Sequence, residues 1–510
     1  MYIDDKILVG KGEDYVYLLP KMANRHGLIA GATGTGKTIT LKVLAESFSD
    51  MGVPVFLADI KGDVSGMCKP GVNNEHIAKR LQTLGLSDFN FKSYPTEFWD
   101  VFGESGLPIR TTISEMGPEM LGRLMNLTDI QKGVLNIVFR IADDNGMLLI
   151  DIRDLRAMLA FVGKHNKDYT INYGNVSSQS IGAIQRALLS LEDEGGNLFF
   201  GEPELSIDDW LRHDDNGKGV INILHCVKLF NKPTLYSTFM LWMLTELYEN
   251  LPEVGDLPQP KVVFFFDEAH VLFKNTGKAL VEKIEQVIKL IRSKGVGVYF
   301  VTQNPGDIPD SVLAQLGNRV QHALRAYTPS DQKAVRTAAQ SFRTNPAFNT
   351  EDVISELGTG EALVSFLDEK GRPSIVQRTL VLPPMSNMDI IDNERRNIII
   401  ESSVLNEKYR NAIDRKSAYE TINEQKEAEN KKLEMARQYE LEEQTTSFPT
   451  SPNNDRHYQY PDYRSTTSRS TRSTRKSPSL FDSVAKSAMN TIGRELGRNL
   501  VRSLLGILKK

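Results

Sequence analysis

The sequence of 510 residues predicts an α/β fold with a mainly parallel sheet, and three observations lead to this prediction. Short apolar runs alternate with amphipathic helical patterns over residues 27–70 and 219–303, as in βα units. One apolar run is followed by a glycine-rich turn. Another ends in two consecutive acids. Both features come at the carboxyl ends of predicted strands, where open α/β sheets hold their ligands.

The glycine-rich turn fits the pattern G-x-x-x-x-G-K-[ST] of a phosphate-binding loop. It lies between the apolar run 27–30 and a helix with an apolar face over 41–48. Glycines let backbone N–H groups turn inward around phosphate oxygens. We expect Lys37 to reach the β- and γ-phosphates and Thr38 to place its hydroxyl on Mg²⁺, while the helix directs its positive end at the anion. The loop therefore predicts binding of a nucleoside triphosphate by Gly31, Ala32, Thr33, Gly34, Thr35, Gly36, Lys37 and Thr38.

The two acids follow a fully apolar strand at residues 262–266, which is the Walker B pattern. We expect Asp267 to hold Mg²⁺ through water and Glu268 to polarise the attacking water. The alternative is a core strand whose acids cap a following helix. The letters of residues 267–270 also match a box of superfamily-2 helicases, but the spacing and the later strands do not support that assignment.

Composition places few restrictions on function. A chain with 40% hydrophobic and 25% charged residues is typical of soluble globular proteins. Its two cysteines, Cys68 and Cys226, lie far apart, which argues against a zinc site or a disulfide framework and suits a reducing cytosol. We expect a cytoplasmic protein, because residues 1–6 do not resemble a signal peptide and no apolar run approaches the roughly 20 residues of a membrane span.

The net charge of −4 conceals an asymmetry. Residues 455–510 hold 12 basic and 4 acidic side chains, a net charge of +8, which leaves −12 on the rest of the chain. Nucleic-acid binding by the core would therefore need a local basic patch, because the bulk charge repels phosphate.

Residues 1–70 are predicted to form the first part of the ATPase core. A short β element over 1–26 leads into the first core strand, and residues 53–59 form a buried strand that ends in an acid. Asp59 or Asp63 either helps to position Mg²⁺ or water, or caps a turn, and the sequence leaves both alternatives open.

Residues 71–217 read as an α-helical insertion, with amphipathic patterns at 120–127, 134–141, 155–162 and 181–191. The sequence leaves three alternatives open: the insertion shapes a substrate surface, forms a subunit interface or has no role beyond enlarging the fold. Residues 218–385 complete the core with a strand at 219–224 and a helix at 235–251.

Three further polar residues follow the Asp-Glu strand. Gln303 ends the next strand, where it suits a sensor that hydrogen-bonds the γ-phosphate or water, or else caps the strand. Residues 316–329 are predicted as a strand with Arg319 and Arg325 towards its ends. Either arginine is a candidate to reach a neighbour's nucleotide as an arginine finger, and the alternative for each is a structural ion pair. Residues 360–366 and 374–381 are predicted to close the core as a β-hairpin.

The C-terminal part changes in composition. Residues 386–444 are predicted as a long, charged, solvated helix with weak heptads. Residues 445–479 are predicted to be disordered. Residues 480–510 form an apolar helical stripe with Arg494, Arg498 and Arg502 on another face. This last helix docks on the chain's own body or an oligomer partner, or on an anionic membrane or nucleic acid.

With these motifs in order, the sequence resembles the HerA/FtsK superfamily of P-loop ATPases, and more closely the YjgR-type HerA-like family. The resemblance is carried by residues 24–38 (NRHGLIAGATGTGKT), 264–270 (FFFDEAH), 292–305 (RSKGVGVYFVTQNP) and 315–329, with further strings at 112–118 and 199–203. It covers roughly residues 1–385.

The resemblance implies a RecA-like ATPase core that uses ATP and Mg²⁺ and assembles as a homo-oligomer, usually a hexamer with nucleotide between subunits. Lys37, Thr38, Asp267, Glu268 and Gln303 match the family's Walker and sensor positions, and Arg319 or Arg325 falls where such proteins carry a trans-acting arginine. HerA itself has an N-terminal β-barrel, for which about 25 residues ahead of the loop leave no room.

Two functions compete at this point. The first is a motor ATPase that moves or remodels DNA. The second is an ATP-driven assembly or switch protein that engages a protein or membrane partner through residues 480–510. A small-molecule kinase fits less well, because Asp267, Glu268 and Gln303 suit activation of water and no lid with clustered arginines is evident.

Overall fold

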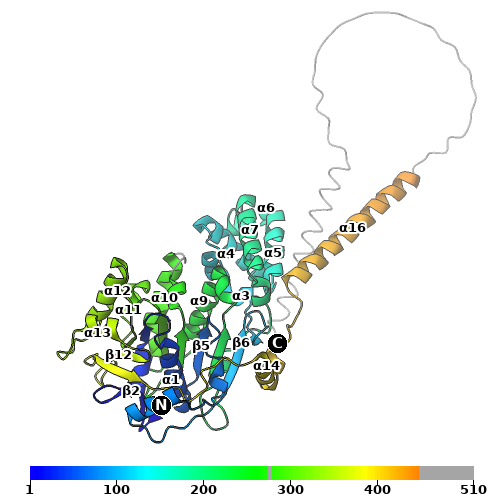
Figure 1. Cartoon of the computed structure of the whole chain (residues 1–510). Helices are drawn as coiled ribbons and strands as arrows, with labels where there is room; N and C mark the ends of the chain where they lie inside the picture. The colour runs from blue at the N-terminus through cyan, green and yellow to red at the C-terminus, as the bar shows by residue number, and fades with distance from the viewer. Residues whose placement is uncertain (274–277, 447–510) are drawn as a thin grey trace, which may run out of the picture. The chain divides into compact units, whose positions relative to one another are not determined.

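The strands of residues 1–273 and 278–446, the part of the chain that this computed structural model describes, form one 13-stranded sheet (Figure 1). The strand order is β1-β2-β13-β12-β11-β4-β10-β9-β5-β8-β6-β7, with β3 paired to β2. All neighbours from β11 to β7 pair in parallel, and the strands at the β1 end pair antiparallel. The predicted α/β P-loop fold with a mainly parallel sheet is confirmed.

The strands are β1 (Tyr2–Ile3), β2 (Lys6–Lys11), β3 (Tyr15–Leu18), β4 (Gly27–Ala30), β5 (Val55–Asp59), β6 (Thr96–Asp100), β7 (Leu107–Pro108), β8 (Ile221–His225), β9 (Val262–Phe266), β10 (Val296–Thr302), β11 (Asn318–Gln321), β12 (Glu361–Ser365) and β13 (Gln377–Val381). The helices up to the insertion's end are α1 (Lys37–Asp50), α2 (Glu75–Leu84), α3 (Ile113–Leu124), α4 (Asp129–Asp144), α5 (Ile152–Lys164), α6 (Asn166–Tyr173), α7 (Ser178–Asp193) and α8 (Gly196–Phe199). The later helices are α9 (Pro233–Asn250), α10 (Lys278–Ile291), α11 (Asp310–Leu313), α12 (Pro329–Gln340), α13 (Thr350–Glu356), α14 (Asn393–Ser402), α15 (Asn406–Tyr409) and α16 (Ala418–Thr446).

The central strands are buried on both faces, as their continuous apolar runs predict. Alternate residues of β9 belong to two different cores: Val263 and Phe265 pack with α1, whereas Phe264 and Phe266 pack with α9, α10 and the helices of the insertion. Helices therefore cover both faces, and polar groups reach solvent mainly at the ends of the strands.

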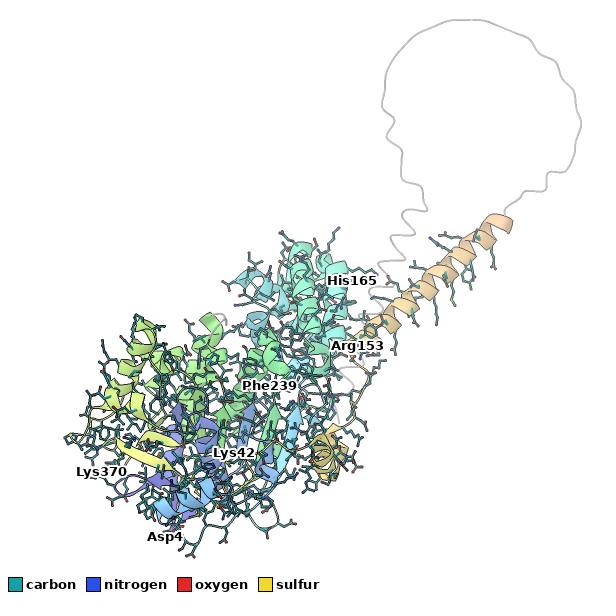
Figure 2. All side chains as sticks on the ribbon, viewed as in Figure 1. Asp4, Lys42, Arg153, His165, Phe239 and Lys370 are labelled. Atoms are coloured by element: carbon teal, nitrogen blue, oxygen red, sulfur yellow. The ribbon has the colours of Figure 1, made fainter. Side chains whose placement is uncertain are left out.

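Helix α1 is hydrogen-bonded to the segment that follows β13. The buried carboxylate of Glu46 accepts hydrogen bonds from the backbone N–H groups of Met385 (2.8 Å) and Ser386 (3.0 Å) and from the Ser386 hydroxyl. One turn earlier on α1, the Nζ atom of Lys42 donates to the carbonyl oxygens of Asn387 and Met388 at 3.2 and 3.3 Å. Lys42 is 1% exposed and lies within the body, whereas Lys370 is exposed at an edge (Figure 2).

The interpretation of residues 71–217 as a purely helical insertion is wrong for β6 and β7, which extend the parallel sheet beyond β8. Acidic residues in β6 interrupt the apolar pattern from which a buried strand is predicted. Glu97 is buried and accepts a hydrogen bond from Ser403 (2.8 Å) and an ion pair from Arg212 (3.5 Å), so a charged residue occupies a core position. The other predicted helices of this region are present as α3, α4, α5 and α7.

The segment 386–444 is not one solvated helix. It contains α14, α15 and most of α16, with breaks between them, and its first part packs on the core through buried residues that include Arg396, Tyr409 and Ile422. From residue 424 to 442, α16 is exposed throughout. The predicted disordered stretch is 445–479, and its first two residues belong to α16. The rest of it, 447–479, and the predicted helix at 480–510 lie outside the described residues. Among the helices of the described part, none combines the length and apolar character needed to cross a membrane.

Candidate active site

The candidate site lies at the carboxyl ends of four neighbouring central strands, β4, β10, β9 and β5. The strand register pairs Ala30 with Thr302 and pairs Phe266 with Ala58. The residues directly after these four positions are Gly31, Gln303, Asp267 and Asp59, so four distant parts of the sequence meet here. This convergence is what the sequence predicts from acids and amides at the carboxyl ends of parallel strands.

The phosphate loop is shaped to accept an anion. Gly34 and Gly36 have φ angles of +76° and +117°, which side chains rarely adopt. Helix α1 begins at Lys37, so the backbone N–H groups of its first turn have no acceptor within the helix, and Gly36 supplies no side-chain cap. Unpaired donors that converge at a helix N-terminus are the usual means of binding phosphate.

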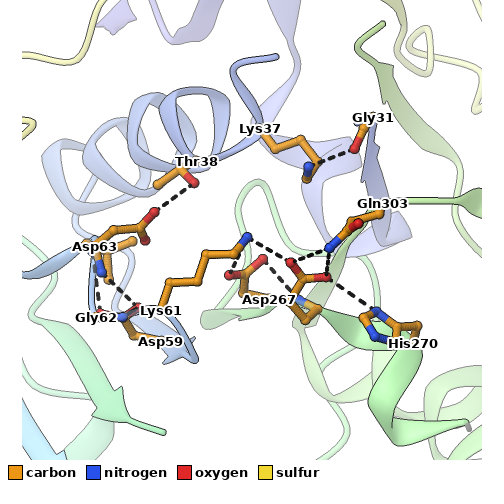
Figure 3. Close-up of polar contacts among 12 residues, drawn as sticks. Gly31, Lys37, Thr38, Asp59, Lys61, Gly62, Asp63, Asp267, His270 and Gln303 are labelled. Atoms are coloured by element: carbon orange, nitrogen blue, oxygen red, sulfur yellow. Dashed lines mark hydrogen bonds and ion pairs between the residues drawn. The ribbon is translucent and has the colours of Figure 1, made fainter. Parts of the chain in front are cut away.

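Lys37 curls back over its own loop. Its Nζ atom donates to the carbonyl oxygens of Gly31 (2.7 Å) and Ala32 (3.0 Å) (Figure 3). Burial and the nearby charge of Lys61 lower the pKa of Lys37. A bound phosphate would supply the negative charge that this buried ammonium lacks.

The two aspartates of the β5 loop have different roles. Asp59 is buried and accepts backbone N–H bonds from Gly62 (2.7 Å), Asp63 (3.2 Å) and Val64 (3.4 Å), so it holds the turn. Burial and the neighbouring Asp63 raise the pKa of Asp59 to about 7. Asp63 instead accepts a hydrogen bond from the hydroxyl of Thr38 at 3.3 Å (Figure 3). Of the two, Asp63 is therefore the one that faces the predicted Mg²⁺ position.

Glu268 is the centre of a group of polar contacts. Its backbone has a φ angle of +45°, which is uncommon for a residue other than glycine. Lys61 Nζ lies 2.7 Å from Glu268 Oε1, and Gln303 Nε2 donates to the two carboxylate oxygens at 3.1 and 3.2 Å. Lys61 Nζ also lies 3.9 Å from Asp267 Oδ2. The structure therefore brings together Asp267, Glu268 and Gln303 as predicted.

The two adjacent acids differ in proton affinity. Burial raises the pKa of Asp267 to about 6, against the opposing charge of Lys61. Burial acts in the same direction on Glu268, but hydrogen bonds from Lys61 and Gln303 outweigh it and lower the pKa of Glu268 below its ordinary value. Glu268 is thus a carboxylate at neutral pH. An electron-rich carboxylate at this position can accept a proton from water.

The two predicted arginines are bound within their own chain. The guanidinium of Arg319 donates to the carbonyl oxygens of Leu313, Leu316 and Ser341 at 2.9–3.1 Å. Strand β11 ends at Gln321, so Arg325 lies beyond it rather than within the strand, and its exposed guanidinium reaches the carbonyl oxygens of residues 355 and 357. A role for either arginine in a neighbouring subunit stays a prediction.

Sequence reasoning missed two residues beside the loop. Lys61 comes two residues after the end of β5, a strand that ends in an acid, and this position is the signal that it lies at the catalytic edge. His322 is fully buried beneath the phosphate loop, where its Nε2 atom lies 2.8 Å from Thr40 Oγ1 and its Nδ1 atom 2.9 Å from the carbonyl oxygen of Glu361. A Cβ atom at Gly31 would lie 2.5 Å from the Cβ of His322, so the loop packs on the histidine only because residue 31 is glycine.

Residues 4–510 match a family described as helicase HerA-like, C-terminal. The chain belongs to this family. The predicted resemblance is thereby confirmed, and the helicase HerA-like match includes all the residues of the site described above.

Two curated relatives of this HerA-like chain are named DNA double-strand break repair helicase HerA. The protein of Sulfolobus acidocaldarius is 23% identical over 347 residues, which are 67% of this chain and 62% of the relative. The protein of Sulfurisphaera tokodaii is 22% identical over 382 residues, which are 71% of this chain and 67% of the relative. The HerA-like chain thus spans about two thirds of the length of these relatives.

Solved structures similar to the HerA-like chain include the bacterial conjugative coupling protein TrwB, with 16% identity and a TM-score of 0.48 over 77% of this chain and 92% of that one. VirB4 of Thermoanaerobacter pseudethanolicus has 15% identity and a TM-score of 0.45 over 75% of this chain and 97% of that one.

Proposed function

We propose that this HerA-like chain is a cytoplasmic, Mg²⁺-dependent ATPase that acts on DNA as a ring-shaped homo-oligomer. The observation that carries the proposal is the contact between Glu268 and Gln303 at the edge of the sheet that bears the phosphate loop. A carboxylate beside an amide suits the orientation of water for attack on a γ-phosphate. The choice of ATP follows from family membership, because the loop reads phosphates and not the base.

The phosphate loop binds the triphosphate in this proposal. The backbone N–H groups of residues 34–38 donate to phosphate oxygens, and Lys37 exchanges its two loop carbonyls for the β- and γ-phosphates. Thr38 and Asp267 are the residues that would hold Mg²⁺, with Asp63 hydrogen-bonded to Thr38. When bound, Mg²⁺ neutralises charge that develops on the phosphates.

Hydrolysis depends on Glu268. Its carboxylate accepts the proton of the attacking water, and Gln303 orients the same water or the γ-phosphate. The neighbouring Asp267 has a raised pKa, and metal binding would favour its ionised form. The division of roles is therefore a metal-holding Asp267 beside a water-activating Glu268.

DNA as the substrate is supported by the names of the HerA relatives. Residues 1–454 carry a net charge of −12, so DNA must meet a local basic surface or the basic segment 455–510. The same charge distribution favours a second candidate function, in which residues 480–510 engage a protein or an anionic membrane and the ATPase drives assembly.

ATP hydrolysis measured with DNA, with RNA and without nucleic acid, over a series of salt concentrations, tests the proposal. We expect Mg²⁺-dependent hydrolysis that DNA stimulates and that salt weakens, because DNA binding releases counterions. Hydrolysis without any response to DNA, together with loss of partner or vesicle binding on deletion of residues 480–510, would favour the second function. Phosphate transfer to a metabolite without release of orthophosphate would contradict both.

A further inference from the structure

The carboxylate of Glu268 is already occupied by donors of its own chain. Oε1 faces Lys61 Nζ at 2.7 Å and Gln303 Nε2 at 3.1 Å, and Oε2 accepts from Gln303 at 3.2 Å. His270 Nδ1 lies 3.3 Å from Oε2, although without the geometry of a hydrogen bond. The Glu268 side chain is only 5% exposed. A carboxylate offers about four acceptor positions, so a water can use Oε1 as a base only after one donor has left.

Lys61 is the donor best placed to leave. Gln303 directly follows β10, and His270 belongs to a short 3-10 turn, η5 (Ala269–Leu272), so the core fixes both backbones. Lys61 instead reaches Glu268 on a long flexible stem from the loop after β5, and its side chain is 36% exposed (Figure 3). A primary ammonium is also a compact charge without a fixed plane, which lets it change partners.

A terminal phosphate would compete for this ammonium. Lys61 Nζ lies 3.9 Å from Asp267 Oδ2, the carboxylate expected to hold the metal, and its charge acts on Lys37 of the phosphate loop. The ammonium therefore lies between the loop and the two acids. A γ-phosphate bound by Lys37 carries more negative charge than the carboxylate of Glu268 and attracts Lys61 more strongly.

We propose that Lys61 is a positioning residue that holds Glu268 in the nucleotide-free chain and moves to the terminal phosphate when a nucleoside triphosphate binds. The move frees an acceptor position on Glu268 Oε1 for water and adds a cation to the phosphate that is attacked. A diphosphate lacks the γ-phosphate, so Lys61 stays on Glu268. This inference rests on the proposed ATPase function and adds that the base becomes available only in the triphosphate state.

The test compares the affinity of each variant for ADP and for a non-hydrolysable ATP analogue, both with Mg²⁺, by calorimetry. Lys61→Met removes the ammonium, Lys61→Gln is a second neutral variant, and Lys61→Arg keeps the charge. Lys69→Met is the matched control, because Lys69 is also 36% exposed and forms an ion pair elsewhere, 3.5 Å from Asp392. Each lysine variant is also made in the Glu268→Gln background.

We expect Lys61→Met and Lys61→Gln to weaken binding of the ATP analogue and to leave ADP affinity within about twofold. The loss should be about tenfold or more in the Glu268→Gln background, as for one charge-assisted hydrogen bond. The loss of affinity for the ATP analogue should be smaller when Glu268 is present, because Lys61 must first leave the Glu268 carboxylate before it can bind the phosphate. Lys61→Arg should recover most of the affinity, and Lys69→Met should change neither value.

Equal losses for ADP and the analogue, or equal losses in the two backgrounds, would show that Lys61 only supports the loop. Lys61 variants that behave like Lys69→Met would also overturn the inference. The proposed ATPase function fails separately, if the parent chain releases no phosphate or if Glu268→Gln hydrolyses ATP at the parent rate. An ATPase that depends on Glu268 but shows no triphosphate-specific effect of Lys61 leaves the function standing and removes only this inference.

Discussion

The Nζ atom of Lys37 lies 2.7 Å from the carbonyl oxygen of Gly31, in the place where the loop would hold a phosphate. We expect Lys37→Ala to weaken ATP binding by at least about tenfold, since it removes a charge-assisted contact. Its effect on folding should be smaller than that of Lys42→Ala on the same helix, which is the contrasting control. Of the two carbonyl oxygens that Lys37 contacts, that of Ala32 keeps a hydrogen bond from the Thr35 hydroxyl. Lys42→Ala leaves two carbonyl contacts without their donor, and we expect it to lower stability by about 1–3 kcal/mol. Calorimetry and thermal unfolding of both variants check the contrast.

Glu268→Gln separates binding from hydrolysis. The amide keeps the size of the side chain but cannot accept a proton from water, so turnover should fall by about 10²-fold or more while ATP still binds. Phosphate release at saturating ATP measures the effect. Glu192→Gln is a suitable control, because Glu192 pairs with Arg156 in the helical layer away from the site and should leave turnover unchanged. Normal turnover in Glu268→Gln would assign the base to another residue.

Arg319 and Arg325 should differ in their effects on folding. Arg319 is largely buried and satisfies three carbonyl oxygens, so Arg319→Ala should lower the free energy of unfolding by on the order of 1–3 kcal/mol. Arg325 is exposed, so Arg325→Ala should leave the unfolding temperature nearly unchanged.

If Arg325 completes a neighbour's site, the ATPase rate per subunit should rise with protein concentration. Mixing Arg325→Ala with Lys37→Ala should then restore part of the activity, because each variant supplies what the other lacks. A rate that is independent of concentration, without recovery on mixing, would place the finger elsewhere or exclude a shared site.

Two buried histidines predict acid-dependent stability. Burial lowers the pKa of both His322 and His26 to about 4, whereas an unfolded histidine titrates near 6.5. Between these values the unfolded chain binds more protons at these two positions, so the stability that the two histidines contribute is complete above about pH 6.5 and falls towards pH 4, by about 1 kcal/mol per pH unit for each histidine. Asp59 and Asp267, whose pKa values are raised, contribute in the opposite direction.

Urea unfolding from pH 4 to 8 checks this slope. We expect His322→Gln to lower the free energy of unfolding at all pH values. Below pH 6.5 this free energy should fall less steeply than in the parent chain, since only His26 of the two histidines then titrates. An unchanged slope in this variant would mean that His322 is protonated in the folded chain.

The parts of the site that the sequence predicts are those fixed by backbone periodicity. A glycine-rich loop, an Asp-Glu pair and a glutamine each follow an apolar run, and parallel strands bring such ends to one edge regardless of their separation in sequence. Contacts made by long side chains do not follow from periodicity. Nothing in the local sequence of Lys61 indicates that its ammonium meets Glu268, and the carbonyl partners of Arg319 depend on a turn and a helix end that lie elsewhere.

The sheet was harder to predict at its edges than at its centre. Strand β6 contains Glu97 and Asp100, whose buried carboxylates are stabilised by tertiary partners and by backbone N–H groups. Such acids remove the apolar pattern from which a strand is inferred. The same reasoning fails for residues 386–417, where a charged composition suggested a solvated helix but a few apolar residues, Tyr409 among them, are enough to dock the segment.

Glu46 and Lys42 give helix α1 a mechanical role. The helix begins at the phosphate loop, and its side grips residues 385–388, from which the chain continues into α14. A force that pulls on the chain after β13 is therefore borne by the helix that carries Lys37 and Thr38, and a tilt of that helix is transmitted outward along the same path. Residues 385–388 therefore join the beginning of the C-terminal segment to the helix that carries the nucleotide loop.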